Sequence, residues 1–135
     1  MIKLITGKKG SGKTKILIDQ INESVKATNG SVVCVEKGST VRYSISRKVR
    51  WCDTEYYKVE GYDAFYGFIA GLLASNYDIT HIYVDGILRI TGRDYTALGK
   101  MLENIDALTG EDVTVVFTIS ADIDDLSENV KQFIK

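Results

Sequence analysis

The stretch Gly7-Lys8-Lys9-Gly10-Ser11-Gly12-Lys13-Thr14 decides the fold of this 135-residue chain, because it fits the pattern G-x-x-x-x-G-K-[ST] at every fixed position. It follows a short apolar run at residues 2–6 and precedes residues 13–27, whose apolar side chains recur at helical spacing. A loop of this kind between a strand and a helix surrounds phosphate groups with backbone N–H groups. The stretch therefore predicts a phosphate-binding loop that opens the first helix.

The side chains of the loop have separate expected roles. Gly7, Gly10 and Gly12 lack a Cβ atom, so the backbone can adopt unusual angles and approach an anion closely. Lys13 is expected to reach the β- and γ-phosphates, and the hydroxyl of Thr14 is expected to ligate Mg²⁺. The other positions of the predicted nucleotide-binding loop are Lys8, Lys9 and Ser11.

This loop closely resembles the Walker A loop of P-loop NTPases, and residues 81–85 (His-Ile-Tyr-Val-Asp) resemble a Walker B strand of the same superfamily. The resemblance implies that ATP and Mg²⁺ are the cofactors and that Asp85 helps to hold the metal with Thr14. Because ligands of doubly wound sheets bind at the carboxyl ends of the strands, we expect Asp85 at the same edge as the loop. The alternative is that Asp85-Gly86 only forms a turn.

Short apolar runs alternate with helical periods along the rest of the chain, which predicts βαβ units and right-handed crossovers. We expect a single domain, residues 1–135, with the three-layer α/β/α fold of P-loop NTPases and a mainly parallel sheet. The expected strands are residues 2–6, 31–36, 81–85 and 113–119, and the expected helices are residues 13–27, 63–75 and 94–108. A last helix is expected to carry Leu126, Val130, Phe133 and Ile134.

Residues 37–60 are harder to interpret. Apolar and polar side chains alternate over residues 41–45, and residues 56–59 resemble a short strand. Residues 37–52 carry five basic side chains and no acidic one, interleaved with aromatic residues. Residues 37–50 could therefore bind a nucleic acid, grip a phosphorylated substrate, close over the nucleotide as a lid, or form a solvated surface, which is the interpretation we favour.

Three further positions bear on hydrolysis. Many ATP-hydrolysing relatives have a glutamate directly after the Walker B Asp, and this chain has Gly86 there. RecA-like ATPases take the glutamate from the strand after the P-loop helix, so Glu36 is either a catalytic residue that orients water or an exposed residue paired with Lys37. Thr118 and Ser120 end the last strand, where related ATPases place a γ-phosphate sensor, a role that Thr118 could have. Hydroxyls at a strand end also cap helices, and Ser120 or Asp122 could cap the last one.

Two arginines, Arg89 and Arg93, follow Asp85 in an expected loop. Either of them could neutralise the γ-phosphate, within the chain or across a subunit interface, although surface ion pairs are the simpler expectation. Between residues 101 and 130 the chain has eight acidic residues and no basic one. This asymmetry against the basic stretch raises self-association or a protein partner as a further prediction.

Composition excludes several classes of protein. The net charge of −1 argues against a general nucleic-acid coat, and no apolar stretch is long enough to span a membrane. Cys34 and Cys52 form no CxxC pair and the chain has one histidine, so a zinc site is not expected. The start of the sequence lacks the pattern of a signal peptide, so we expect a cytoplasmic protein with reduced cysteines.

The resemblance leaves three functions open. The first is a weak or partner-stimulated ATPase, or an ATP-dependent switch, with a RecA-like core. The second is a kinase for a small acceptor such as a nucleoside, although the chain has little length for a lid and an acceptor pocket. The third is a nucleotide sensor or assembly module that hardly hydrolyses, which Gly86 favours over a robust motor. A GTPase is not expected, because no asparagine begins the guanine-reading motif N-K-x-D.

Overall fold

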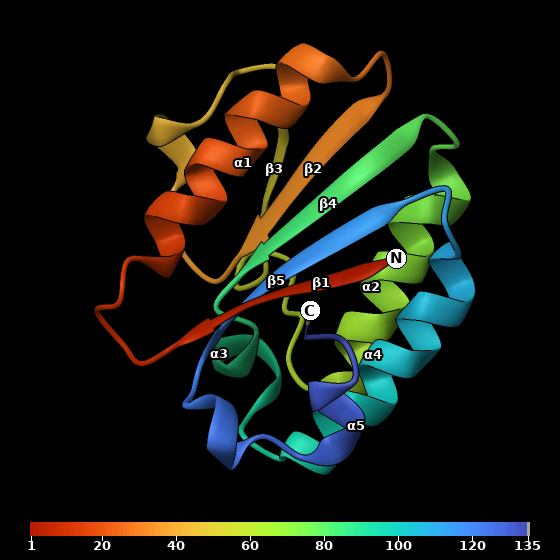
Figure 1. Ribbon diagram of the computed structural model, residues 1–135. Helices are drawn as coiled ribbons and strands as arrows, with labels where there is room; N and C mark the ends of the chain where they lie inside the picture. Colours follow the sequence, from red (N-terminus) through yellow and green to blue (C-terminus); the bar gives the residue numbers. More distant parts are fainter. Residues whose placement is uncertain (135) are drawn as a thin grey trace.

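Residues 1–134 are described by a computed structural model in which five parallel strands form one sheet in the order β1-β5-β4-β2-β3 (Figure 1). The expected α/β fold with a parallel sheet is confirmed. The strands are β1 (Ile2–Gly7), β2 (Ser31–Glu36), β3 (Arg50–Asp53), β4 (Ile79–Asp85) and β5 (Thr114–Ser120). The helices are α1 (Lys13–Ala27), α2 (Tyr62–Ser75), α3 (Ile87–Thr91), α4 (Tyr95–Thr109) and α5 (Glu128–Lys131), and two 3₁₀ turns are η1 (Arg42–Ser44) and η2 (Ile123–Asp125).

The helices cover both faces of the sheet, with α1 on one side and α2, α4 and α5 on the other (Figure 1). Strand β2 shows how the sequence builds this arrangement, because four of its successive side chains are apolar and buried. Val32 and Cys34 belong to the cluster around α1, whereas Val33 and Val35 belong to the cluster on the other face. A strand buried on both faces is the usual result of right-handed crossovers in a parallel sheet.

Strand β5 lies between β1, which leads into the P-loop, and β4, which ends at Asp85. All five strands run in the same direction, so Gly7, Glu36, Asp85 and Ser120 end at one edge of the sheet. This edge is where the sequence predicted the nucleotide.

The interpretation of residues 37–60 was wrong in its details. Residues 41–45 contain the 3₁₀ turn η1, and Val41 is fully buried and Ile45 partly buried, whereas Tyr43 lies at the surface. The segment expected as a strand at residues 56–59 lies mainly in a turn with two exposed tyrosines. The strand that the structure contains in this segment, β3, was not predicted. It has four residues, lies at the edge of the sheet and starts at exposed Arg50, so it shows no clear apolar pattern.

Two further expectations are corrected near the end of the chain. Residues 87–91 form the short helix α3 where a loop was expected, and this helix begins after Gly86. The last helix, α5, has four residues, and only Val130 of the predicted apolar stripe lies in it. Leu126, Phe133 and Ile134 lie outside the helix and still pack on the main core. The apolar pattern therefore predicted their burial correctly and the length of the helix incorrectly.

No helix among residues 1–134 combines the length and the apolar character needed to cross a membrane.

Candidate functional site

The P-loop connects β1 to α1 and encloses the ammonium group of Lys13. Lys13 Nζ donates to the carbonyl oxygen of Lys8 at 2.8 Å and to Ser11 Oγ at 3.3 Å. The N-cap residue of α1 is Gly12, with φ of 89°, and it provides no side chain to accept from the first-turn amides. A positive charge and free amides therefore point to the same small volume, which suits an anion.

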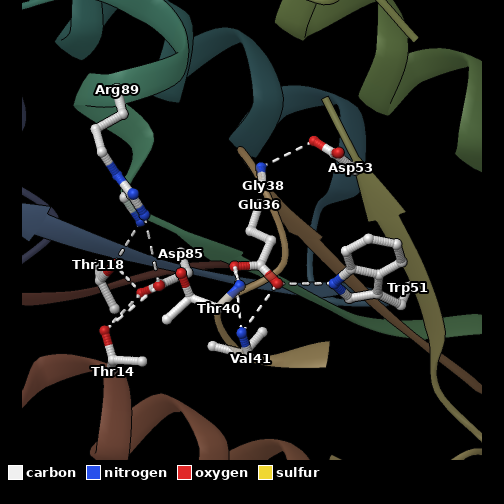
Figure 2. A network of polar contacts seen from close by, with 11 residues as sticks. Thr14, Glu36, Gly38, Thr40, Val41, Trp51, Asp53, Asp85, Arg89 and Thr118 are labelled. Carbon is white, nitrogen blue, oxygen red and sulfur yellow. Dashed lines mark hydrogen bonds and ion pairs between the residues drawn. The ribbon is translucent and has the colours of Figure 1, made fainter. Parts of the chain in front are cut away.

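Asp85 lies at the centre of the candidate site. Its carboxylate is almost completely buried and accepts a hydrogen bond from Thr118 Oγ1 at 2.7 Å. The hydroxyl of Thr14 lies 3.3 and 3.4 Å from its two oxygens, and Arg89 Nη2 lies 3.8 Å from Oδ2 (Figure 2). The structure thus brings together Thr14 and Asp85, as the sequence predicted, together with Thr118 and Arg89.

The hydroxyl of Thr118 joins the last strand to the segment after β4. It donates to Asp85 and accepts from the Gly86 amide at 2.7 Å, whereas Asp122 caps the 3₁₀ turn η2 by accepting from the Asp124 amide. Its role as a γ-phosphate sensor stays a prediction.

Thr118→Val is expected to lower the free energy of unfolding by about 1–3 kcal/mol, because the buried Asp85 carboxylate and the partly buried Gly86 amide each lose a partner. Thr118→Ser keeps the hydroxyl and is the matched control, with a smaller expected loss. Urea unfolding of both variants measures the difference. Equal stability of the valine variant and the parent would show that these two hydrogen bonds contribute nothing.

Glu36 is fully buried, so the expectation of an exposed residue paired with Lys37 is wrong. Its Oε1 accepts from the Thr40 amide at 2.9 Å, and its Oε2 accepts from the Val41 amide at 3.0 Å and from Trp51 Nε1 at 2.8 Å (Figure 2). Glu36 and Asp85 are direct neighbours in the register of β2 and β4, so the residue does lie at the expected edge. That Glu36 orients water stays a prediction, since both of its oxygens already accept hydrogen bonds.

Glu36 holds the loop of residues 37–41 through its amides, and the sequence did not predict that a second carboxylate would contact this loop. Asp53, at the end of β3, accepts from the Gly38 amide at 2.8 Å. Trp51 lies on β3 and carries the guanidinium of Arg42 over its ring at 4.5 Å. Both contacts depend on β3, and nothing in the local sequence pattern distinguished that strand from its surroundings.

The basic stretch, residues 37–52, packs on α1, and its closure over a nucleotide as a lid stays a prediction. Asn22 of α1 donates to the Ser44 carbonyl oxygen at 3.1 Å and accepts from the Ser46 amide at 2.9 Å. Val41 and Val49 are buried in the cluster around the same helix. The five basic side chains remain exposed, and nucleic-acid binding through residues 37–50 stays a prediction.

Arg93 contacts Ser120, which pairs with Gly7 in the register of β1 and β5, so it lies near the start of the loop. It donates from Nη1 to the carbonyl oxygen of Ser120 at 3.4 Å, whereas Arg89 alone of the two reaches Asp85.

Both cysteines are free and buried. Burial raises the pKa of the Cys34 thiol, and it raises the pKa of the Cys52 thiol as well. Cys52 pairs with Val35 in the register of the strands, so the two cysteines are not direct neighbours. These thiols are therefore protonated structural groups at neutral pH.

The residues present fit a Mg²⁺–nucleotide better than a free metal ion. Among residues 1–134, no three His, Cys, Asp or Glu side chains are grouped so that they could hold a metal. Mg²⁺ typically binds through one or two carboxylates together with substrate phosphates, so Asp85 and the Thr14 hydroxyl are a sufficient protein contribution.

The fold is therefore the three-layer α/β/α fold of P-loop NTPases, with a parallel sheet and the loop at its carboxyl edge. No family model matches the sequence, and no curated protein matches it. In contrast, 74 chains of solved structures match, among them the structure of C. elegans PCH-2. That likeness has a TM-score of 0.57 at 15% sequence identity, and it covers 99% of this chain and 34% of PCH-2. At this identity the comparison shows the fold alone.

Proposed function

We propose that this chain binds ATP with Mg²⁺ at the loop Gly7 to Thr14 and acts as a weak or partner-stimulated ATPase or as an ATP-dependent switch. One observation carries the proposal. The hydroxyl at the end of the loop, on Thr14, lies within 3.4 Å of the Asp85 carboxylate, 71 residues away in sequence. A hydroxyl and a carboxylate brought together beside a phosphate-binding loop are the ligands that a nucleotide-bound Mg²⁺ takes from a protein.

The residues of the chain have separate roles in this proposal. Lys13 exchanges its contacts with Lys8 and Ser11 for phosphate oxygens, and the first-turn amides of α1 donate to the same anion. Thr14 and Asp85 hold Mg²⁺, and Thr118 fixes the orientation of Asp85. Mg²⁺, when bound, neutralises negative charge on the phosphate oxygens.

Two observations favour slow hydrolysis. The position after Asp85 is Gly86, so no carboxylate follows the metal-binding residue directly. The nearest other carboxylate at this edge, Glu36, already accepts hydrogen bonds from two amides and an indole. An activating base must accept a proton from water, so Glu36 has to leave these partners before it can act. A partner protein or a second copy that moves the loop 37–41 would supply that change.

The proposal is tested by calorimetric titration with ATP, ADP and GTP, with Mg²⁺ or with EDTA, alongside phosphate release. We expect ATP to bind in a Mg²⁺-dependent manner, GTP to bind more weakly, and phosphate release to be slow. Rapid release without any partner would contradict the switch, and binding of neither ATP nor ADP would contradict the proposed function as a whole.

A further inference from the structure

Asp85 is paired with a cation from its own sequence neighbourhood. Arg89 lies four residues further along, on α3, and its Nη2 is 3.8 Å from Asp85 Oδ2 (Figure 2). The two side chains differ sharply in exposure, which is 52% for Arg89 and 4% for Asp85. An ion pair with one half-exposed partner, at a separation longer than a hydrogen bond, is weak. When the guanidinium leaves, the Asp85 carboxylate keeps its hydrogen bond from Thr118, and Mg²⁺ would replace the positive charge.

The guanidinium also takes the space above Gly86. A Cβ atom on residue 86 would lie 2.7 Å from both Nε and Nη2 of Arg89, and the φ angle of 71° favours glycine there. A side chain at position 86 and the present place of the Arg89 guanidinium therefore exclude each other. Beside the proposed metal ligand, this chain presents a positive group and no carboxylate at position 86.

Helix α3, which carries Arg89, is packed firmly against the rest of the domain. Its other four residues, Ile87, Leu88, Ile90 and Thr91, are all buried. The Ile90 carbonyl oxygen accepts from the Gly61 amide at 3.0 Å, which ties α3 to the start of α2. The backbone of Arg89 is thus held, and its long side chain is the one part of α3 with freedom to turn. A pocket of about 400 Å³, which Arg89 borders with Lys37 and Lys58, gives the side chain room.

We propose that Arg89 binds the terminal phosphate of the nucleotide and makes the site prefer a triphosphate to a diphosphate. The inference rests on the proposed function, because it assigns a residue to the nucleotide of that same site. A guanidinium presents paired donors that match phosphate oxygens, and a triphosphate carries more negative charge than a diphosphate. Thr14, at the end of the loop, and Arg89, on α3, reach the carboxylate of Asp85 from opposite sides (Figure 2).

Calorimetric titration of ATP and ADP with Mg²⁺ tests the inference on the parent, Arg89→Ala and Arg89→Lys. We expect Arg89→Ala to weaken ATP binding by about 10- to 100-fold and to change ADP binding by less than about threefold. Arg89→Lys should recover part of the preference, because it keeps the charge and loses the paired donors. Lys15→Ala is the control and should bind both nucleotides like the parent, since Lys15 pairs with Asp19 on the exposed surface of α1.

The outcomes separate the two proposals. Equal weakening of ATP and ADP in Arg89→Ala, or no change in either, would overturn the role of Arg89 and leave the proposed function standing. Failure of the parent to bind either nucleotide would overturn the proposed function and this inference with it.

Discussion

Replacing Lys13 by alanine is expected to weaken Mg²⁺–ATP binding by about 100-fold or more and to leave the domain folded. The expected loss corresponds to about 3 kcal/mol, which is the strength of a charge-assisted hydrogen bond at a desolvated site. Lys13 is only 7% exposed, and its ammonium is the group that the loop encloses. Calorimetric titration of the variant with ATP measures the effect.

Lys15→Ala is the matched control for this variant. Lys15 lies two residues further along α1, is exposed, and pairs with Asp19 at 3.5 Å on the outer surface of the helix. We expect it to bind ATP like the parent, with a similar melting temperature. If Lys13→Ala binds ATP as tightly as Lys15→Ala does, the loop is not the nucleotide site.

Glu36→Gln is expected to lower the free energy of unfolding by about 3 kcal/mol and the melting temperature by about 10 °C. The carboxylate faces only donors, which are the amides of Thr40 and Val41 and the indole of Trp51. A glutamine places its own NH₂ group against one of them, whichever way the amide is turned. Such a loss is a large part of the stability of a domain of this size.

Thermal unfolding followed by tryptophan emission measures this effect, because Trp51 is the single tryptophan of the chain and donates directly to Glu36. Glu55→Gln is the control, since Glu55 is exposed and lies in the turn after the same strand, β3. If Glu36→Gln melts like the parent, the carboxylate is not an anchor of the loop 37–41. Loss of phosphate release from a variant that remains fully folded and binds ATP would instead support the prediction that Glu36 orients water.

The sequence predicted the elements that carry long, regular patterns. The P-loop motif, the helix after it and the buried strands β2, β4 and β5 each depend on local signals, such as glycine positions, helical spacing and unbroken apolar runs. The meeting of Thr14 and Asp85 followed from one further rule, that parallel strands end at a common edge. For these residues, pattern and topology were sufficient.

The rest of the site depends on contacts that no local pattern records. The sequence around Glu36 is equally consistent with an exposed residue at the end of a strand. Its burial depends on β3, because Trp51 of that strand donates to its carboxylate. The pairing of Arg89 with Asp85 requires one turn of helix at α3, and five residues are too few to show a helical period. Short elements take their conformation from tertiary packing, so a local sequence pattern does not predict their position.

Strand β1 pairs with β5 on one side and, within residues 1–134, with no strand on the other. About half of the amides of an edge strand point away from the sheet and exchange their hydrogens with solvent quickly. The same strand leads directly into the P-loop at Gly7, so an anion that orders the loop also steadies the end of β1. Amide hydrogen exchange along β1 therefore measures the order of the loop without any substitution. We expect exchange to become slower toward Gly7 when the loop binds a phosphate.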